Sequence, residues 1–193
     1  MGKAVRRSER IDDGDLGEAV ARARQGDEAA FAVVFRAVQP MLAGYLRGLV
    51  GDDADDIASE TWHDIVRDLR AFRGDGMSFR GWAATIARHR ALDHLRRTKV
   101  RPQTTELHED TTRQVLVRDS ESLALENLST ERAVALIASL PRDQAEAVLL
   151  RVVLGLNAPT AAKVLGKRPG AVRTAAHRGL KRLSERLSGA GEK

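Results

Sequence analysis

The chain has 193 residues, no cysteine and a formal net charge of +5 at pH 7. The lack of cysteine excludes disulfides and thiolate metal sites and is typical of a reducing compartment. Few Gly and Pro and abundant Ala, Leu, Arg and Glu favour helices, so we expect an all-α protein of one domain or two small ones. The longest apolar stretch, 147–156, is interrupted by Arg151 and is too short to span a membrane. With no secretion signal at the start, we expect a cytoplasmic protein.

Helical periodicity begins near the start of the chain. A short helix is expected over 16–25, and Asp27 is a candidate N-cap for a longer helix whose apolar residues recur every three or four positions up to Leu49. Pro40 falls inside this pattern and is expected to kink or divide the helix.

An acidic helix is expected next, over 52–69, because Asp and Glu suit a helix N-terminus. A glycine-bearing loop, 73–78, then leads to a helix over 79–97. The apolar stripe of the acidic helix is expected to be buried and consists of Ile57, Ile65, Val66 and Leu69.

The pattern loses its period after Thr98, and the next residues are polar and acidic, as in a flexible linker. Basic clusters lie on both sides, at 88–101 and 163–186, and such clusters favour contacts with DNA phosphates. We therefore divide the chain into an N-terminal extension with a short helix (1–26), a helical domain (27–101), a flexible acidic linker (102–127) and a second helical domain (128–193).

The most informative segment, Asn157 to Leu187, has the pattern of a helix, a tight turn and a second helix. Ala162, Gly166 and Val172 have the spacing at which two crossing helices need a small contact residue, a left-handed turn and an apolar plug. One face of the second helix is expected to pack and carries Val172, Ala176, Leu180, Leu183 and Leu187. The opposite face is expected to enter a DNA groove and carries Arg173, Thr174, His177, Arg178 and Lys181. The alternative is a solvated basic helix on an ordinary bundle.

Four segments in this order resemble one family. The sequences DDADDIASETWHDIV, AFRGDGMSFRGWAATIARHRALDHLRR and SLPRDQAEAVLLRVVLGL, followed by the helix-turn-helix, are similar to the extracytoplasmic-function (ECF, group 4) sigma factors of bacterial RNA polymerase. The resemblance implies that Phe31–Arg101 is region 2, which docks on the β′ clamp of the polymerase and opens the minus-10 element. It implies that Leu128–Leu187 is region 4, which holds the β flap and reads the minus-35 element. The implied partners are core polymerase, promoter DNA and, as a further candidate, an anti-sigma factor.

The resemblance also implies roles for single residues. By this resemblance, the residues that bind core polymerase are Asp55, Asp56, Glu60 and Trp62. Ser59 stands where relatives usually have Gln. The minus-10 element would be recognised by two groups of residues. Asp75, Met77 and Ser78 would form a pocket for a flipped base, and Thr85, His89 and Arg96 of the following helix would contact the DNA beside it. DNA phosphates would be held by Arg97, Lys99 and Arg101. The minus-35 readers would be Arg173, Thr174, His177, Arg178 and Lys181. Trp82, at the edge of the apolar stripe, matches a core position of the family and is expected to pack, with strand separation as the alternative.

Other interpretations stay open at this point. Asp52, Asp53 and Asp56 spell DDxxD, a magnesium pattern of isoprenoid synthases, but two Trp, one Tyr and four Phe cannot line the cavity those enzymes need. The acidic helix is alternatively a solvated face, the 73–78 loop an ordinary turn, and the linker a plain spacer rather than a polyanion that threads the polymerase cleft.

From another class, the chain is alternatively a stand-alone helix-turn-helix regulator that binds palindromic DNA as a dimer, although no dimer helix is evident. A pure interaction protein would leave the two basic faces unexplained. No nucleophile and base occur in a recognisable arrangement, and no phosphate-binding glycine loop follows a strand. We therefore expect no enzyme activity, no metal and no cofactor.

Overall fold

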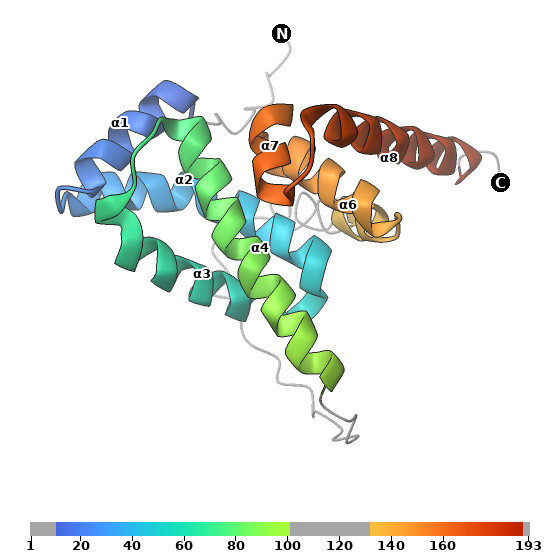
Figure 1. The fold of residues 1–193 in the computed structure, drawn as a ribbon, viewed down its shortest axis with the longest axis horizontal. Helices are drawn as coiled ribbons and strands as arrows, with labels where there is room; N and C mark the ends of the chain where they lie inside the picture. Colours follow the sequence, from blue (N-terminus) through green and yellow to red (C-terminus); the bar gives the residue numbers. More distant parts are fainter. Residues whose placement is uncertain (1–10, 101–131, 191–193) are drawn as a thin grey trace, which may run out of the picture.

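The computed structural model describes residues 11–100 and 132–190, and all regular structure in these ranges is helical, which confirms the all-α expectation. The linker expected at 102–127 lies outside the described residues. The first range forms an N-terminal bundle and the second a C-terminal bundle, which lie against each other (Figure 1). The N-terminal bundle consists of α1 (Asp13–Ala23), α2 (Glu28–Val50), α3 (Ala54–Asp68) and α4 (Gly76–Val100). The C-terminal bundle consists of a short helix at 132–138, α6 (Arg142–Val148), α7 (Ala158–Leu165) and α8 (Pro169–Ala190).

Helix α1 is part of the N-terminal bundle. Leu16 and Val20 are fully buried, and the helix packs against both α2 and α4. The buried Arg80 of α4 pairs with Asp13 at 2.8 Å and so ties the start of α1 to α4. The short helix expected within the N-terminal extension (1–26) is therefore α1, and it packs in this bundle.

Helix α2 continues through Pro40 as one helix, so of the two expected effects of this proline, a kink or a division, division does not occur. Its N-terminus is capped as expected, because a carboxylate oxygen of Asp27 accepts a hydrogen bond from the amide of Ala30 at 2.9 Å. By length and composition the stretch from Glu28 to Ala71 is apolar enough to cross a membrane. The apolar residues of α2 contribute to the core of the bundle, and those fully buried include Val34, Val38, Leu42 and Leu46.

Helices α3 and α4 differ from the expected pattern at three points. A 3-10 turn at Gly51–Asp53 precedes α3, and the side chain of Val66, expected in the core, is 53% exposed. Helix α4 begins at Gly76 rather than Phe79, because Asp75 caps it three residues earlier. A Cβ at Gly76 would collide with the backbone of Asp13, so glycine permits the close approach of α1 and α4.

The C-terminal bundle contains the expected helix-turn-helix. Asn157 caps α7 by accepting from the amide of Thr160 at 2.9 Å, and Gly166 ends α7 in the left-handed conformation, with φ of 63°. Val172 of α8 is buried as the expected apolar plug. A π-helical turn, Leu149–Val153, joins α6 to the segment before α7. Ala162 is also buried at the crossing of the two helices.

The packed face of α8 is shorter than the sequence predicted. Leu180 is 46% exposed and Leu187 is 60% exposed, so both are wrongly assigned to the packing face. Gly179 is buried in their place, and a Cβ there would lie 2.8 Å from the side chain of Val148. Helices α6 and α8 approach each other closely at Gly179, and the neighbouring Leu180 lies on the exposed side of α8.

Candidate DNA and polymerase interfaces

The outer face of α8 presents all five residues expected to read the minus-35 element. Arg173, Thr174, His177, Arg178 and Lys181 are exposed, while Val172 and Ala176 on the opposite face are buried. One face of α8 therefore fixes the helix on the bundle, and the other carries three cations and two further hydrogen-bonding side chains into solvent. This is the geometry that a recognition helix needs to enter a major groove.

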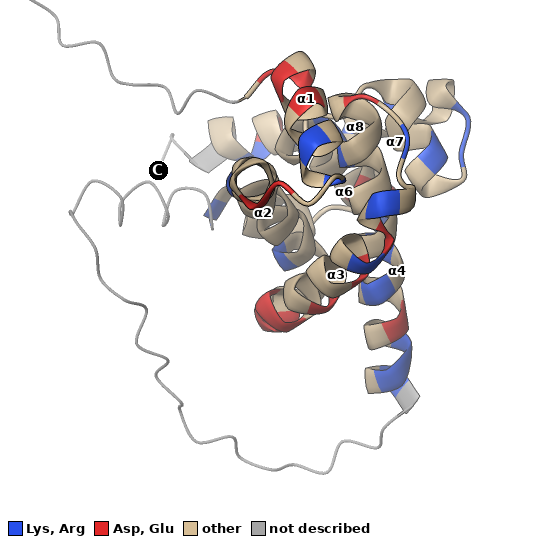
Figure 2. Ribbon diagram, turned by 90° about the vertical axis from the view of Figure 1, so that its left-hand side faces the viewer, with Lys and Arg blue, Asp and Glu red and all other residues tan. Residues whose placement is uncertain are grey.

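The start of α3 presents an acidic surface to solvent (Figure 2). Asp55 and Asp56 are exposed, and Asp55 lies 3.6 Å from Arg47 of α2. Glu60 is half-buried and pairs with Arg90 of α4 at 3.4 Å. The two aspartates are thus available to a partner, whereas Glu60 also holds α3 to α4.

Trp62, expected to contact the polymerase, lies largely inside the bundle and is 7% exposed. Its indole N–H donates to the side-chain oxygen of Gln39, and its ring centroid lies 6.0 Å from that of Phe31 and 4.7 Å from that of Phe35. Phe35 is 39% exposed and, with the exposed Val66, adds apolar area next to this tryptophan. Trp62 therefore lies beneath this surface, and Phe35 and Val66, which sequence reasoning did not select for it, are exposed.

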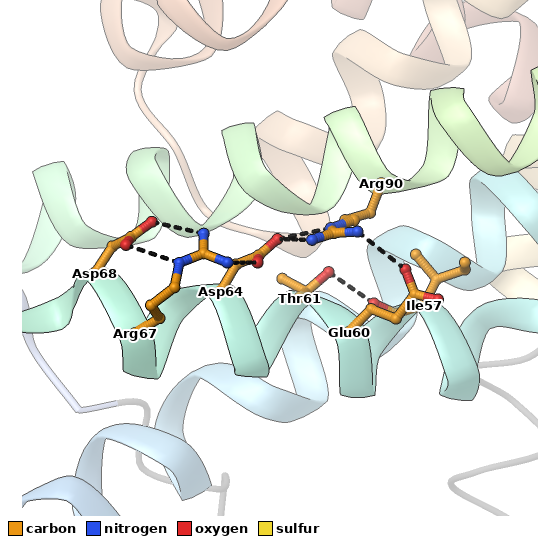
Figure 3. A network of polar contacts seen from close by, with 7 residues as sticks. All are labelled: Ile57, Glu60, Thr61, Asp64, Arg67, Asp68 and Arg90. Atoms are coloured by element: carbon orange, nitrogen blue, oxygen red, sulfur yellow. Dashed lines mark hydrogen bonds and ion pairs between the residues drawn. The ribbon is translucent and has the colours of Figure 1, made fainter.

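A chain of ion pairs fixes α3 against α4 (Figure 3). Asp64 is buried and accepts from Arg67 of its own helix at 2.7 Å and from Arg90 of α4 at 2.6 Å. Hydrogen bonds from Arg67 hold the pKa of Asp68 below its usual range, and hydrogen bonds to Asp68 and Asp64 raise the pKa of Arg67. The network sets the position of the acidic helix relative to α4.

The loop expected to form a base pocket is organised by a helix cap. The carboxylate of Asp75 accepts from the amide of Ser78 at 2.8 Å, and hydrogen bonds from the Ser78 hydroxyl and amide lower the pKa of Asp75. Met77 packs against the core. Of the three residues expected to form the pocket, Ser78 lines the cavity described next.

A cavity of about 270 Å³ lies beside the first turns of α4. Its aromatic wall is fixed by ring packing, with the ring centroid of Trp82 5.1 Å from that of Phe72 and 5.7 Å from that of Phe79. Arg73 is held at the rim by donating to the backbone oxygens of Arg70 and Phe72 at 2.8 and 2.7 Å. The N-terminal bundle contributes Phe72, Arg73, Ser78, Gly81, Trp82 and Thr85, and α7 contributes Thr160, Lys163 and Val164.

Trp82, expected to pack at the edge of the apolar stripe, is half-buried and packs against the core, and it also lines the wall of the cavity. The loop 73–78 was selected from the sequence, but neither Arg73 at its start nor Phe72 before it was among the residues chosen for the pocket. An aromatic residue followed by an arginine is too common a pattern to point to a cavity.

Beyond the cavity, α4 continues as a basic helix. His89 and Arg96 are exposed on it, and Arg96 pairs with Asp93 at 3.1 Å. Arg97 and Lys99, expected to hold phosphates, are exposed near its end, and Arg101 lies outside the described residues. Over residues 11–100 and 132–190, no group of three or more His, Asp or Glu side chains could hold a metal ion.

Comparisons with known proteins show which family this arrangement belongs to. The family model for Sigma-70 region 2 matches residues 34–101, and that for Sigma-70, region 4 matches residues 130–183. The ECF RNA polymerase sigma factor SigD of Mycobacterium tuberculosis is 34% identical over 92% of this chain and 86% of its own length. ShbA of Streptomyces griseus, also an ECF sigma factor, is 34% identical over 87% of this chain and 93% of its own length.

Two solved structures share the fold. CnrH, in complex with the cytosolic domain of CnrY, matches with a TM-score of 0.62 at 22% identity over 91% of this chain and 98% of that one. RpoE of Bartonella quintana, in complex with the anti-sigma factor NepR, matches with a TM-score of 0.58 at 21% identity over 82% of this chain and 96% of that one.

Fold and surface together define a helix-turn-helix protein with a second, basic helical bundle. The similarity to SigD over almost the whole chain makes the assignment more specific. The chain belongs to the ECF family of RNA polymerase sigma factors. The N-terminal bundle contains its region 2 and the C-terminal bundle its region 4.

Proposed function

We propose that this chain binds core RNA polymerase in the cytoplasm, directs it to promoters with minus-35 and minus-10 elements, and helps to open the DNA without catalysing a reaction itself. The observation that carries the proposal is the two-faced α8. Its apolar side is fixed by buried Val172 and Ala176, and its outer side exposes five polar residues, three of them cations, at the end of a helix-turn-helix.

For the minus-10 element, we place the base pocket in the cavity beside α4. A flipped base needs a ring or apolar surface to stack on and polar groups for its edge, because unstacking costs a few kcal/mol. Trp82 and Phe72 offer the surface, and Arg73, Ser78 and Thr85 the polar groups. Asp75 then positions Ser78 by capping the helix rather than touching the base.

The exposed end of α4 continues the same path along the DNA. His89 and Arg96 would meet neighbouring positions of the minus-10 element, and Arg97, Lys99 and Arg101 would neutralise phosphates. Phosphate contacts carry no sequence information, so these three cations fix the register in which the pocket meets its base.

For the clamp, we propose the exposed Asp55 and Asp56 together with the adjacent Phe35 and Val66, with Glu60 at the edge. Mixed acidic and apolar area suits a stable protein interface, in which apolar contacts supply affinity and charges supply orientation. The relative RpoE was solved with an anti-sigma factor, which supports an anti-sigma factor as a further partner of this chain.

Run-off transcription with purified core polymerase on a library of genomic fragments tests the proposal. We expect discrete transcripts that require both the chain and core polymerase, with shared minus-35 and minus-10 sequences upstream. Binding to palindromic DNA without polymerase, and no transcripts with it, would instead establish a stand-alone regulator.

A further inference from the structure

Three arginines gather near the start of α4. Arg24 directly follows α1, Arg70 lies in the 3-10 turn Leu69–Ala71 after α3, and Arg73 lies in the loop that leads to α4. We propose that these three residues, the arginine edge, hold phosphates of the single-stranded DNA that continues downstream of the base captured in the cavity beside α4. The proposal rests on the proposed function of that cavity and adds a third promoter contact to the minus-35 and minus-10 elements.

A backbone acceptor brings the arginines together although their charges repel. The guanidinium of Arg73 donates to the carbonyl oxygen of Arg70 at 2.8 Å, and the guanidinium of Arg24 donates to the same oxygen at 3.5 Å. Two positive charges therefore meet at one acceptor. Helix α1 ends at Ala23 and the turn after α3 ends at Ala71, and the partial negative charge of such carbonyl ends offsets part of the repulsion. The edge is thus preformed without a ligand.

No carboxylate neutralises the arginine edge within the described residues. Asp27 and Glu28 line a groove with Arg70, but Asp27 pairs with Arg22 at 2.6 Å and neither acid lies within ion-pair distance of Arg70. Arg70 is exposed, and its side chain makes no hydrogen bond in the part of the chain that the structure describes. Because a guanidinium has five N–H donors and no acceptor, most donors of the edge are left for an anion with several oxygens. Phosphate meets this requirement.

The position of the edge favours DNA as the source of the phosphates. Arg73 also lines the proposed base pocket, and the ends of α1 and α3 lie beyond it, away from the basic end of α4 at Val100 (Figure 1). The minus-35 element lies upstream, so the duplex meets the basic end of α4 and its non-template strand then runs to the pocket. On leaving the pocket, the strand comes to the arginine edge, where cations can follow its backbone. The edge therefore lies downstream of the captured base.

Two pre-melted promoter fragments test the proposal with the assembled holoenzyme. In the short fragment the non-template strand ends at the captured base, and in the long one it continues for about six more nucleotides, enough to pass a site of single-strand size. We expect Arg24→Gln combined with Arg70→Gln to weaken binding of the long fragment at least about ten-fold and to leave the short one unaffected. Arg73 is kept, because it also lines the pocket.

The salt dependence of binding to the long fragment reports the same contact. Each phosphate contact on a single strand contributes about 0.7 to the slope of log affinity against log salt, so the double variant should lower the slope by about 1.4. Changing the bases downstream of the pocket should leave the loss unaltered, since phosphate contacts carry no sequence information.

Neutral methylphosphonate groups, placed one at a time downstream of the captured base, locate the contact. We expect one or two positions to weaken binding by the wild type and to have little further effect in the double variant, because both changes remove the same interaction. Arg24→Lys combined with Arg70→Lys keeps the charges and should retain most of the affinity. Arg36→Gln, which removes an exposed arginine of α2, is the control and should bind both fragments as the wild type does.

Equal losses on the two fragments, in a double variant that still co-elutes with core polymerase, would overturn the proposal. Methylphosphonate effects of the same size in variant and wild type would do so too. Where the double variant does not bind core polymerase, Arg70→Gln alone decides, because this side chain is exposed. An abasic site at the captured base that leaves binding unchanged, while the extension still helps only the wild type, would refute the base pocket but support the arginine edge. Wild-type holoenzyme that binds neither fragment would refute both.

Discussion

At the start of α7, the side chain of Asn157 satisfies the amide of Thr160, which has no partner within the helix. We predict that Asn157→Ala lowers the free energy of unfolding of region 4 by about 1 kcal/mol, because the amide loses its acceptor. Urea unfolding followed by circular dichroism measures this. Asn157→Ser is the matched control, since serine also caps; an equal loss in both variants would mean that capping is not the cause.

Asp75 supports a prediction about pH. Hydrogen bonds from Ser78 lower its pKa from the ordinary 3.8, so the ionised carboxylate stabilises the start of α4 above that pH, and the contribution is lost as the pH falls through the lowered pKa. We predict an NMR titration midpoint for Asp75 below 3.8, and a rise toward 3.8 in Ser78→Ala, which keeps the backbone bond but removes the hydroxyl. A midpoint unaffected by that substitution would show that the hydroxyl does not bind the carboxylate.

Single residues were predictable where their role is local. Asp27, Asn157 and Gly166 act on backbone within a few positions of themselves, so the sequence alone assigned the caps and the left-handed turn. Trp62 and Val66 depend on which neighbours cover them, and periodicity does not report that. The first was expected to bind core polymerase and is buried; the second was expected in the core and is exposed.

On the scale of one helix, α8 is expected to divide DNA recognition by face. We predict that Arg173→Ala and Arg178→Ala each weaken use of the minus-35 element while leaving polymerase binding intact. A bidentate base contact contributes about 1–3 kcal/mol of discrimination, whereas a phosphate contact weakens all sequences alike. Transcription from promoters with altered minus-35 elements separates the two. Arg182, exposed on the same helix but outside the expected reading set, provides the control substitution to alanine; equal effects at all three positions would count against the assignment.

Helix α3 gives a corresponding test for the polymerase. We predict that Asp56→Lys strongly reduces co-elution with core polymerase in gel filtration, because it reverses an exposed charge at the proposed clamp surface. Asp56 is chosen over Glu60, whose reversal would also disturb the pair with Arg90. Glu18→Lys, an equivalent reversal on the exposed side of α1, is the control. Unchanged co-elution of Asp56→Lys would reduce the acidic helix to a solvated surface.

Elements were predicted better than their faces. The helices were located from three- and four-residue spacing, yet α4 begins three residues early because of the Asp75 cap, and the packed side of α8 is set by Gly179 against Val148. The helical wheel places Leu180 and Leu187 on the apolar face, but no neighbouring helix covers them and both are exposed. A helix wheel describes one helix, whereas burial also depends on how close the next helix can come.

On the scale of the whole molecule, the contacts between the two bundles could not be predicted from the sequence. Arg88 and Glu146 are 58 positions apart, and the glycines of α2 and α4 that admit region 4 had no periodic signature. The sequence therefore predicted two domains but not that α7 of one lines the cavity beside α4 of the other. Among the described residues, the Tyr45 hydroxyl is one of five buried side-chain polar atoms without a hydrogen-bond partner. Burial, and then the negative charge of Glu146, raise the pKa of Tyr45, which keeps it neutral.

This hydroxyl supports a prediction about the stability of the whole molecule. We predict that Tyr45→Phe raises the free energy of unfolding by about 1 kcal/mol, since the phenyl ring keeps the packing and removes a buried donor without a partner. Urea unfolding followed by circular dichroism measures this. A lower free energy of unfolding in Tyr45→Phe would mean that the hydroxyl is hydrogen-bonded in the folded protein and that its loss costs more than its burial.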